Sequence, residues 1–359
     1  MGMAETEMPR PTDRFNALLT QAVSLGASDV HIVVNAPCTV RVSGELVALG
    51  TGVLTAQDTE EMLREILDDD LWARFKSRGE VDFSYSLSEV GRFRINAYRQ
   101  RGSISMAIRV IPYRIPSFEE LGIPTAVADL VRKQSGLILV TGPAGSGRST
   151  TLASLVDLIN REQRRLVLTI EDPIEYLHRH RRSIVNQREL GVDVASYEEA
   201  LKTAMKQDPD VIFLSELPDA GTISKAIAAA ESGRLVIGGM IALNTSHAIE
   251  RIIDLYPSYH QEAIKTRLAE VLEGIISQRL IKSSSLKTRR VAVFEVLVGA
   301  PIVRKLIKEG RISQIPAAIE GGRQYGMMSM EASARELVRS GQISWKEYED
   351  SIGSPNVAG

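Results

Sequence analysis

The sequence lacks several features that would point to particular classes of protein. Its single cysteine, Cys38, excludes an internal disulfide. Its longest apolar runs, such as 211–214 and 235–237, are far shorter than the roughly 20 residues that cross a bilayer. Basic and acidic residues nearly balance, at 43 and 45, and leave a formal net charge of −2. This balance gives no general attraction to nucleic acid or to an anionic membrane.

The N-terminal residues also lack a targeting signal. They are polar, include acidic side chains and contain no apolar core of the kind a secretory signal needs. We therefore expect a cytoplasmic protein, with a disordered leader over 1–11 and a disordered tail over 355–359. A chain of 359 residues exceeds the usual size of one hydrophobic core, so we expect two domains.

The first half of the chain has the pattern of a compact α+β domain. Apolar residues recur at helical spacing over 14–24, and a second helix is expected near 56–67. Short alternating segments follow the first helix, and alternation resumes over 82–111 with Arg92, Arg94 and Asn96 on one strand face. We place this domain at 12–111.

Three prolines in residues 112–124 predict a linker, because each discourages helix in the residue before it. Beyond it, apolar runs alternate with helical patterns, which is typical of a parallel α/β sheet whose ligands lie at the carboxyl ends of strands. We place this second domain at 125–354. The runs expected as strands are 137–140, 166–170, 211–214 and 235–240. Later in the chain we expect helices at 259–279, 300–309, 330–340 and 345–351, interrupted by one apolar segment at 291–299.

A glycine-rich segment, 136–152, contains the clearest motif in the sequence. An apolar strand, a turn and the start of a helix follow one another there, as the phosphate-loop pattern G-x-x-x-x-G-K-[ST] requires. A structural turn that binds nothing is the alternative, and the matching flanks argue against it. The predicted nucleotide-binding residues are Gly142, Pro143, Ala144, Gly145, Ser146, Gly147, Arg148, Ser149 and Thr150.

One residue departs from this pattern, since Arg148 occupies the lysine position. A phosphate loop surrounds the β-phosphate of ATP with backbone N–H groups and a helix N-terminus, while the hydroxyl of Ser149 can bind Mg²⁺. Arg148 keeps the positive charge but is longer and planar, so it fits a tight cradle less well than lysine. We expect weaker nucleotide binding and a larger loss of hydrolysis.

Acidic residues follow two of the predicted strands. Glu171, Asp172 and Glu175 come after the strand at 166–170, and Glu216 follows the strand at 211–214. Hydrolysis needs carboxylates to position Mg²⁺ and to accept a proton from the attacking water. An acidic turn of this kind is often only a solvated surface feature, but two acidic strand ends behind a phosphate loop favour a catalytic role.

Five segments, taken in order, resemble the PilT-type secretion ATPases, the motors of type IV pilus retraction. They are RFRINAYRQRG, GPAGSGRSTTL, LTIEDPIEYLH with NQRELG, DPDVIFLSELPD and AIERIIDLYP. The resemblance spans about residues 25–354. It implies an N-terminal PAS-like domain, a RecA-like domain with a helical C-terminal region, and a hexameric ring.

The resemblance also implies residue roles and partners. Glu175 matches the general base, and Glu216 matches the Walker B glutamate that, with Ser149, positions Mg²⁺ through the nucleotide. Three arginines match those that the N-terminal domain offers to the phosphates: Arg94, Arg99 and Arg109. The family implies an inner-membrane pilus platform protein as partner, and a location at the inner face of the cytoplasmic membrane.

The chain departs from the family at several positions. The Walker B pattern G-E-M-R-D is here Ser215 to Asp219, so the glycine and the arginine are lost and Pro218 takes the arginine's place. The His box has lost both histidines, with Arg234 and Ile241 in their positions. Isoleucine cannot donate a hydrogen bond to a γ-phosphate. No metal-ligand spacing links the five histidines.

Two functions remain open from the sequence. The first is a hexameric motor that hydrolyses ATP to disassemble pili, and the second is a pseudo-ATPase that co-assembles in a mixed ring with an active paralogue. A related secretion or assembly ATPase is disfavoured because such members carry a tetracysteine zinc site. The basic segment 178–182 resembles a nucleic-acid patch, but without interleaved aromatics we interpret it as a solvated or subunit-facing turn and expect no nucleic-acid partner.

Overall fold

The computed structural model describes residues 11–42, 44–111, 114–283 and 290–353. The chain divides into two compact units, Met1–Tyr113 and Arg114–Gly359. Most of the predicted leader and all of the predicted tail lie outside the described residues. The described part of the chain begins at Pro11 with a helix.

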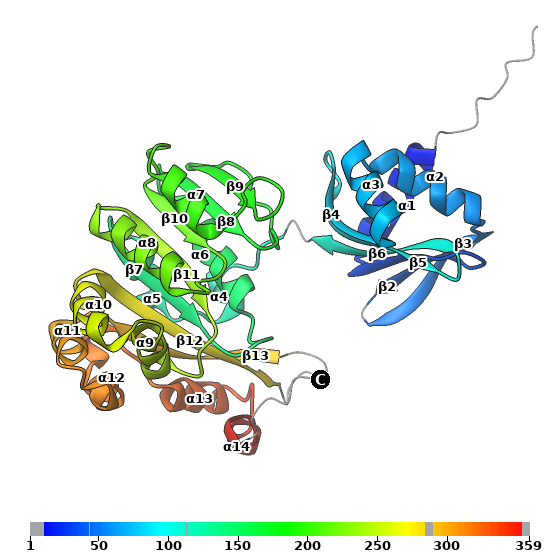
Figure 1. Cartoon of the computed structure of the whole chain (residues 1–359). Helices are drawn as coiled ribbons and strands as arrows, with labels where there is room; N and C mark the ends of the chain where they lie inside the picture. The colour runs from blue at the N-terminus through cyan, green and yellow to red at the C-terminus, as the bar shows by residue number, and fades with distance from the viewer. Residues whose placement is uncertain (1–10, 43, 112–113, 284–289, 354–359) are drawn as a thin grey trace, which may run out of the picture. The chain divides into compact units, whose positions relative to one another are not determined.

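The first unit is a six-stranded antiparallel sheet with three helices over one face (Figure 1). The strand order is β3-β2-β1-β6-β5-β4. Its elements are α1 (Pro11–Ser24), β1 (Asp29–Ile32), β2 (Pro37–Val42), β3 (Glu45–Val53), α2 (Ala56–Ile66), α3 (Asp69–Arg78), β4 (Glu80–Leu87), β5 (Gly91–Gln100) and β6 (Ser103–Ile111).

Alternation along β5 explains how this sheet packs. Phe93 and Ile95 are fully buried, whereas Arg94 between them is exposed, as the period of two predicts. Phe15 of α1 and Phe75 of α3 fill the same core. The helix α3 was missed in the sequence, although Asp68 caps its start and Gly79, at φ 80°, ends it.

The second unit is built on a seven-stranded sheet of order β13-β12-β7-β11-β10-β8-β9. Six neighbouring strands are parallel and only β13 runs antiparallel, against β12. The strands are β7 (Gly136–Thr141), β8 (Leu166–Glu171), β9 (Ile184–Glu189), β10 (Val211–Leu214), β11 (Leu235–Met240), β12 (Leu272–Lys282) and β13 (Arg290–Val298).

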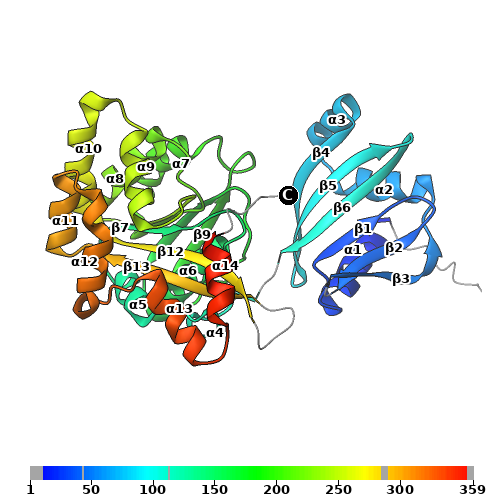
Figure 2. The ribbon, with the colours of Figure 1, turned by 90° about the horizontal axis from the view of Figure 1, so that it is seen from below.

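Helices cover both faces of this sheet (Figures 1 and 2). One face packs against α4 (Phe118–Leu121), α5 (Thr125–Val131) and α6 (Arg148–Glu162). The other packs against α7 (Tyr197–Ala204), α8 (Ala220–Glu231), α9 (Thr245–Asp254), α10 (Ser258–Val271), α11 (Pro301–Lys308) and α12 (Ile315–Gly321). The remaining helices are η1 (Ile312–Gln314), η2 (Arg323–Tyr325), α13 (Met330–Arg339) and α14 (Trp345–Gly353).

Two predictions about this unit were wrong. The helix expected over 259–279 ends at Val271, and the chain continues as strand β12, buried between β7 and β13. The register of β12 against β7 shifts between Leu272 and Gly274, and Gly274 permits close packing there, because a Cβ would lie 2.5 Å from Leu130 Cδ1. The predicted linker was too long, since residues from Arg114 belong to the second unit and Phe118 is buried in its core.

None of the helices in the described part of the chain is long and apolar enough to cross a membrane.

Candidate functional site

The predicted phosphate loop lies between strand β7 and helix α6. Gly147 is the residue before α6, with φ at 86°, and no side chain caps the start of this helix in the described structure. The first N–H groups of a helix lack intrahelical partners and carry partial positive charge. The start of α6 therefore suits a phosphate group.

The loop is supported from β12 by a residue that the sequence did not reveal. Gln278 Nε2 donates a hydrogen bond of 2.6 Å to the carbonyl oxygen of Ser146. Gly142 sits against the same strand, because a Cβ there would lie 2.5 Å from the Gln278 carbonyl oxygen and 2.4 Å from Ser146 Oγ. Gln278 thus holds the loop in place, and Gly142 permits the close approach.

Arg148 turns back onto its own loop. Its Nη1 donates hydrogen bonds to the carbonyl oxygens of Gly142 and Pro143. Burial lowers the pKa of this guanidinium, while the carboxylates of Glu216 and Glu175 act in the opposite direction. The cation therefore lies within electrostatic range of both predicted catalytic carboxylates.

The two hydroxyl residues that follow Arg148 contact the acidic turn after β8. Ser149 Oγ donates to Glu175 Oε1 at 2.8 Å, and Thr150 Oγ1 shares a hydrogen bond of 2.8 Å with the Tyr176 hydroxyl. The predicted Mg²⁺ ligand and the predicted base are therefore direct neighbours. Tyr176 was not identified from the sequence.

Glu171, at the end of β8, is buried beneath this turn. Burial raises its pKa to about 7, and hydrogen bonds from Thr169 and Gln187 oppose that rise. The Oε1 atom accepts from Thr169 Oγ1 at 2.7 Å and from Gln187 Nε2 at 2.9 Å. This carboxyl group is therefore held by its own strand and by β9.

Glu216 reaches the same sheet edge from β10, since β7, β11, β10 and β8 are parallel neighbours. Asp219, three residues later, accepts a hydrogen bond from the Thr222 backbone N–H and caps α8. The acidic residues of the SELPD segment therefore differ in role: Glu216 stands at the site, and Asp219 has a structural role.

The altered His box also ends at this edge. Ile241, in the position of the second histidine, follows β11, and its side chain is exposed. Arg251 of α9 donates from Nη1 to the Ile241 carbonyl oxygen at 2.7 Å, and its charge lowers the pKa of Arg148. Arg251 is thus a second cation near Arg148 that sequence reasoning missed, although it lies within the AIERIIDLYP segment.

A small cavity of about 20 Å³ lies between α6 and the acidic turn. Its lining includes Ser149, Glu171, Glu175 and Ser215. A cavity of this size, lined by both polar and apolar side chains, has room for one water molecule. The predicted Mg²⁺ ligand and the predicted base therefore border the same small cavity.

The three arginines predicted in the first unit do not lie together. Arg94 and Arg109 face each other across β5 and β6, and Arg109 Nε pairs with Asp29 Oδ1 at 3.3 Å. Arg99 projects from the other face of β5, with its guanidinium 5.6 Å from the centre of the Phe75 ring. The odd spacing between Arg94 and Arg99 would have indicated opposite faces.

The basic segment 178–182 is only partly solvated. Burial lowers the pKa of His178 to about 4, and its backbone N–H donates to Gln187 Oε1 at 2.8 Å. The four residues after His178 are exposed. His178 is therefore part of the packing behind the acidic turn.

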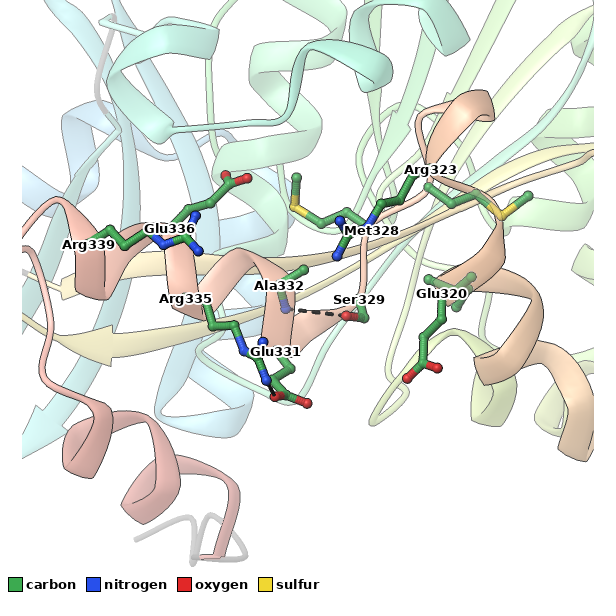
Figure 3. A pocket seen from close by; sticks show the side chains of 11 residues that line it. Glu320, Arg323, Met328, Ser329, Glu331, Ala332, Arg335, Glu336 and Arg339 are labelled. Atoms are coloured by element: carbon green, nitrogen blue, oxygen red, sulfur yellow. Dashed lines mark hydrogen bonds and ion pairs between the residues drawn. The ribbon is translucent and has the colours of Figure 1, made fainter.

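A larger cavity, of about 460 Å³, lies in a different part of the second unit (Figure 3). Residues of α12, η2 and α13 and the segment between η2 and α13 line it, with Arg335 paired to Glu331 at its rim. Arginine and glutamate side chains make up most of its polar lining (Figure 3). None of the residues predicted for the nucleotide site belongs to this cavity.

Comparison with known proteins places the chain in a family. The family model for type II/IV secretion system proteins matches residues 7–350. The uncharacterized protein YggR of Escherichia coli is 38% identical over 326 residues, which cover 91% of this chain and 98% of YggR. The type IV pilus retraction ATPase PilT of Pseudomonas aeruginosa is 36% identical over 327 residues, or 91% of this chain and 94% of PilT.

A solved structure supports the same assignment. The pilus retraction motor PilT with bound ADP aligns with a TM-score of 0.86 and 37% identity, over 95% of this chain and 97% of that one. The predicted α/β fold class and the predicted resemblance to PilT-type ATPases are confirmed. The chain belongs to the family of type II/IV secretion system proteins.

Proposed function

We propose that this chain is a motor ATPase of type IV pilus retraction and twitching motility, which binds ATP with Mg²⁺ and uses hydrolysis to disassemble pili. The observation that carries the proposal is the contact between Ser149 of the phosphate loop and Glu175 of the acidic turn, at 2.8 Å. It brings a nucleotide cradle and a carboxylate base to one edge of the sheet. The similarity to PilT, over nearly the whole chain, supports it.

The residues present fit both nucleotide and metal. The uncapped start of α6 and the backbone of the loop would hold the phosphates, and Arg148 would add a positive charge. The Ser149 hydroxyl and the Glu216 carboxylate have the oxygen chemistry that Mg²⁺ prefers. Bound Mg²⁺ would neutralise charge on the phosphates.

Glu175 is the proposed general base. In the structure its carboxylate accepts the Ser149 hydroxyl proton as a hydrogen bond, so it points towards the loop. With the Ser149 hydroxyl engaged by Mg²⁺, Glu175 would lack this partner, and its carboxylate would be free to accept a proton from the attacking water. The same small cavity borders both side chains.

The proposed assembly is a homo-hexamer that acts on an inner-membrane pilus platform protein at the cytoplasmic face of the membrane. Of the predicted arginines, we assign Arg94 and Arg109 to phosphate contacts, because they share one exposed face of β5 and β6. We do not assign Arg99 to the phosphates, because its guanidinium packs over Phe75.

A second candidate function is a pseudo-ATPase that joins a mixed ring with an active paralogue. The hydrogen bonds from Arg148 to the Gly142 and Pro143 carbonyls favour it, because they hold the loop's only cation on the loop's own backbone. The exposed Ile241 favours it too, since an apolar side chain cannot bind a phosphate.

Purified full-length protein tests the two candidates. The motor function predicts Mg·ATP binding and steady phosphate release, with Glu175→Gln losing release while keeping ADP affinity. Glu162→Gln, at the far end of α6, is the matched control and should behave as wild type. Binding without release, in protein of confirmed oligomeric state, would instead support the pseudo-ATPase. Absence of ATP binding would contradict the proposed function.

A further inference from the structure

Ser215, in the position of the family's Walker B glycine, makes two contacts that glycine cannot make. Its Oγ accepts a hydrogen bond of 3.1 Å from the Asp172 backbone N–H. The same atom shares a hydrogen bond of 2.7 Å with the Tyr197 hydroxyl. One hydroxyl therefore links β10, the acidic turn after β8, and the first residue of α7.

The Tyr197 hydroxyl is well suited to hold Ser215. The side chain is buried, with 7% exposure. Burial raises its pKa to about 12, and Asp172, Glu216 and Glu171 contribute to the rise while the Ser215 hydrogen bond opposes it. Tyr197 therefore keeps its proton at neutral pH, and its hydroxyl remains available to Ser215.

The backbone of Ser215 has little freedom to move. Its N–H donates to the Ile170 carbonyl oxygen at 3.0 Å. On the opposite side, a Cβ on Gly239 would lie 2.2 Å from the Ser215 carbonyl oxygen, so β11 packs directly against it. Because main chain on both sides fixes this residue, its hydroxyl occupies a defined place relative to the acidic turn.

Ser215 also lies beside the proposed catalytic residues. It lines the small cavity that Ser149, Glu171 and Glu175 share. The turn that carries Glu175 begins at Asp172, the residue whose N–H Ser215 accepts. Holding that N–H fixes the start of the turn, and a displacement of about 1 Å at a reacting group is enough to slow a reaction by roughly a hundredfold.

We propose that Ser215 and Tyr197 form a positioning pair that holds the acidic turn 172–175 in the orientation in which Glu175 serves as base. The proposal rests on the proposed function of Glu175. Replacing the family's glycine with serine gives this chain a tether, because glycine would leave the Asp172 N–H and the buried Tyr197 hydroxyl without this partner.

The test uses the nucleotide-free full chain with Ser215→Ala and Tyr197→Phe. Both variants should speed amide hydrogen exchange in the peptide covering 171–177 by roughly two- to tenfold, the range expected for one lost hydrogen bond. Ser224→Ala is the matched control, because Ser224 Oγ shares a 2.8 Å hydrogen bond with the Tyr256 hydroxyl on another part of the unit. It should leave exchange at 171–177 unchanged.

Kinetics then separate positioning from general stability. Ser215→Ala should lower kcat for ATP hydrolysis by about tenfold, with little change in KM. Ser215→Thr keeps the hydroxyl, so its kcat and its hydrogen-exchange rate at 171–177 should both match those of wild type. The double variant Ser215→Ala with Tyr197→Phe should be no worse than either single variant, since the two hydroxyls act together.

Two results would overturn the proposal. One is exchange at 171–177 that matches wild type in both single variants. The other is faster exchange with kcat unchanged in protein that hydrolyses ATP. If wild type binds ATP but releases no phosphate, the proposed function fails, but the positioning pair can still be tested. Hydrogen exchange at 171–177 and Mg·ADP affinity then report whether Ser215 and Tyr197 hold the acidic turn.

Discussion

Arg148 Nη1 donates a hydrogen bond to the Pro143 carbonyl oxygen at 3.2 Å, and it also bonds to the carbonyl of Gly142. The residue that should reach forward to a phosphate is thus bonded backward to the strand end and the first loop residues. These bonds occupy Nη1 and leave the N–H groups of Nη2 and Nε as the donors for a nucleotide. Because the planar group is held on its own loop, it turns towards a phosphate less freely than a lysine ammonium, which lowers the affinity gained from the charge.

Arg148→Lys should therefore increase ATP turnover. A lysine ammonium is compact and can turn between loop carbonyls and phosphate oxygens, so we expect phosphate release to rise by about tenfold, together with tighter Mg·ATP binding. Phosphate release and equilibrium nucleotide binding measure the two effects. The matched control is Arg132→Lys at an exposed ion pair with Glu162, which should change neither.

The outcome of Arg148→Lys also shows which of the other departures from the family limits ATP hydrolysis. If binding improves while phosphate release does not, the altered His box or the lost Walker B arginine limits turnover. A variant with wild-type binding and wild-type rate would mean that the arginine does not impair the loop.

Glu171 should make stability depend on pH. Its folded pKa of about 7 lies above the ordinary value of 4.5, so the folded state binds the proton more tightly. The contribution of Glu171 to the free energy of unfolding is fully present below about pH 4.5 and is lost as the pH rises to about 7. The total loss is at most roughly 3 kcal/mol. Glu171→Gln should match wild type near pH 5 and be more stable near pH 8.

Urea unfolding across this range measures the difference. His178 opposes Glu171 in wild type, because its folded pKa of about 4 lies below the ordinary 6.5, so its contribution rises with pH between these values. The comparison of variant with wild type removes this shared term. Parallel stability profiles for the two proteins would show that Glu171 does not titrate with a raised pKa.

The strand, turn and helix of the predicted phosphate loop could be predicted because they are consecutive in sequence. Strand, turn and helix start occupy 136–152, and each has a local signal. Strand β12 could not be predicted in the same way. Its apolar residues are compatible with a helix, and only burial between β7 and β13 makes it a strand.

That error concealed part of the site. Gln278 lies on β12, 132 residues from the Ser146 carbonyl that it holds, so no local pattern connects them. The acidic turn was visible as a cluster, but its contact with Ser149 depends on the order of parallel strands. Sequence reasoning thus identified the groups that carry charge and missed those that hold the backbone.

The arginines of the first unit should separate by function. Arg94→Ala and Arg109→Ala should each weaken Mg·ATP binding in the assembled protein by about tenfold, as expected for loss of a charged hydrogen bond to a phosphate. Arg99→Ala should leave binding unchanged and destabilise the first unit by about 0.5–1 kcal/mol, because it removes the cation from the Phe75 ring.

Nucleotide titration and thermal unfolding of the three variants measure these effects. Arg99 serves as the matched control, since it lies on the same strand β5 as Arg94 and is also exposed. Weaker nucleotide binding in Arg99→Ala, with normal binding in the other two, would reverse the assignment.

Gln278→Ala should disable the phosphate loop without unfolding the sheet. It removes the 2.6 Å hydrogen bond to the Ser146 carbonyl and leaves the loop's last peptide without its support from β12. The loop must then pay more conformational entropy on binding, so we expect ADP affinity to fall by about tenfold. The matched control is Gln163→Ala, which removes a 3.2 Å bond from Gln163 Nε2 to the Val131 carbonyl at the opposite end of α6. Equal losses of affinity in both variants would mean that general destabilisation of α6, and not support of the loop, explains the effect.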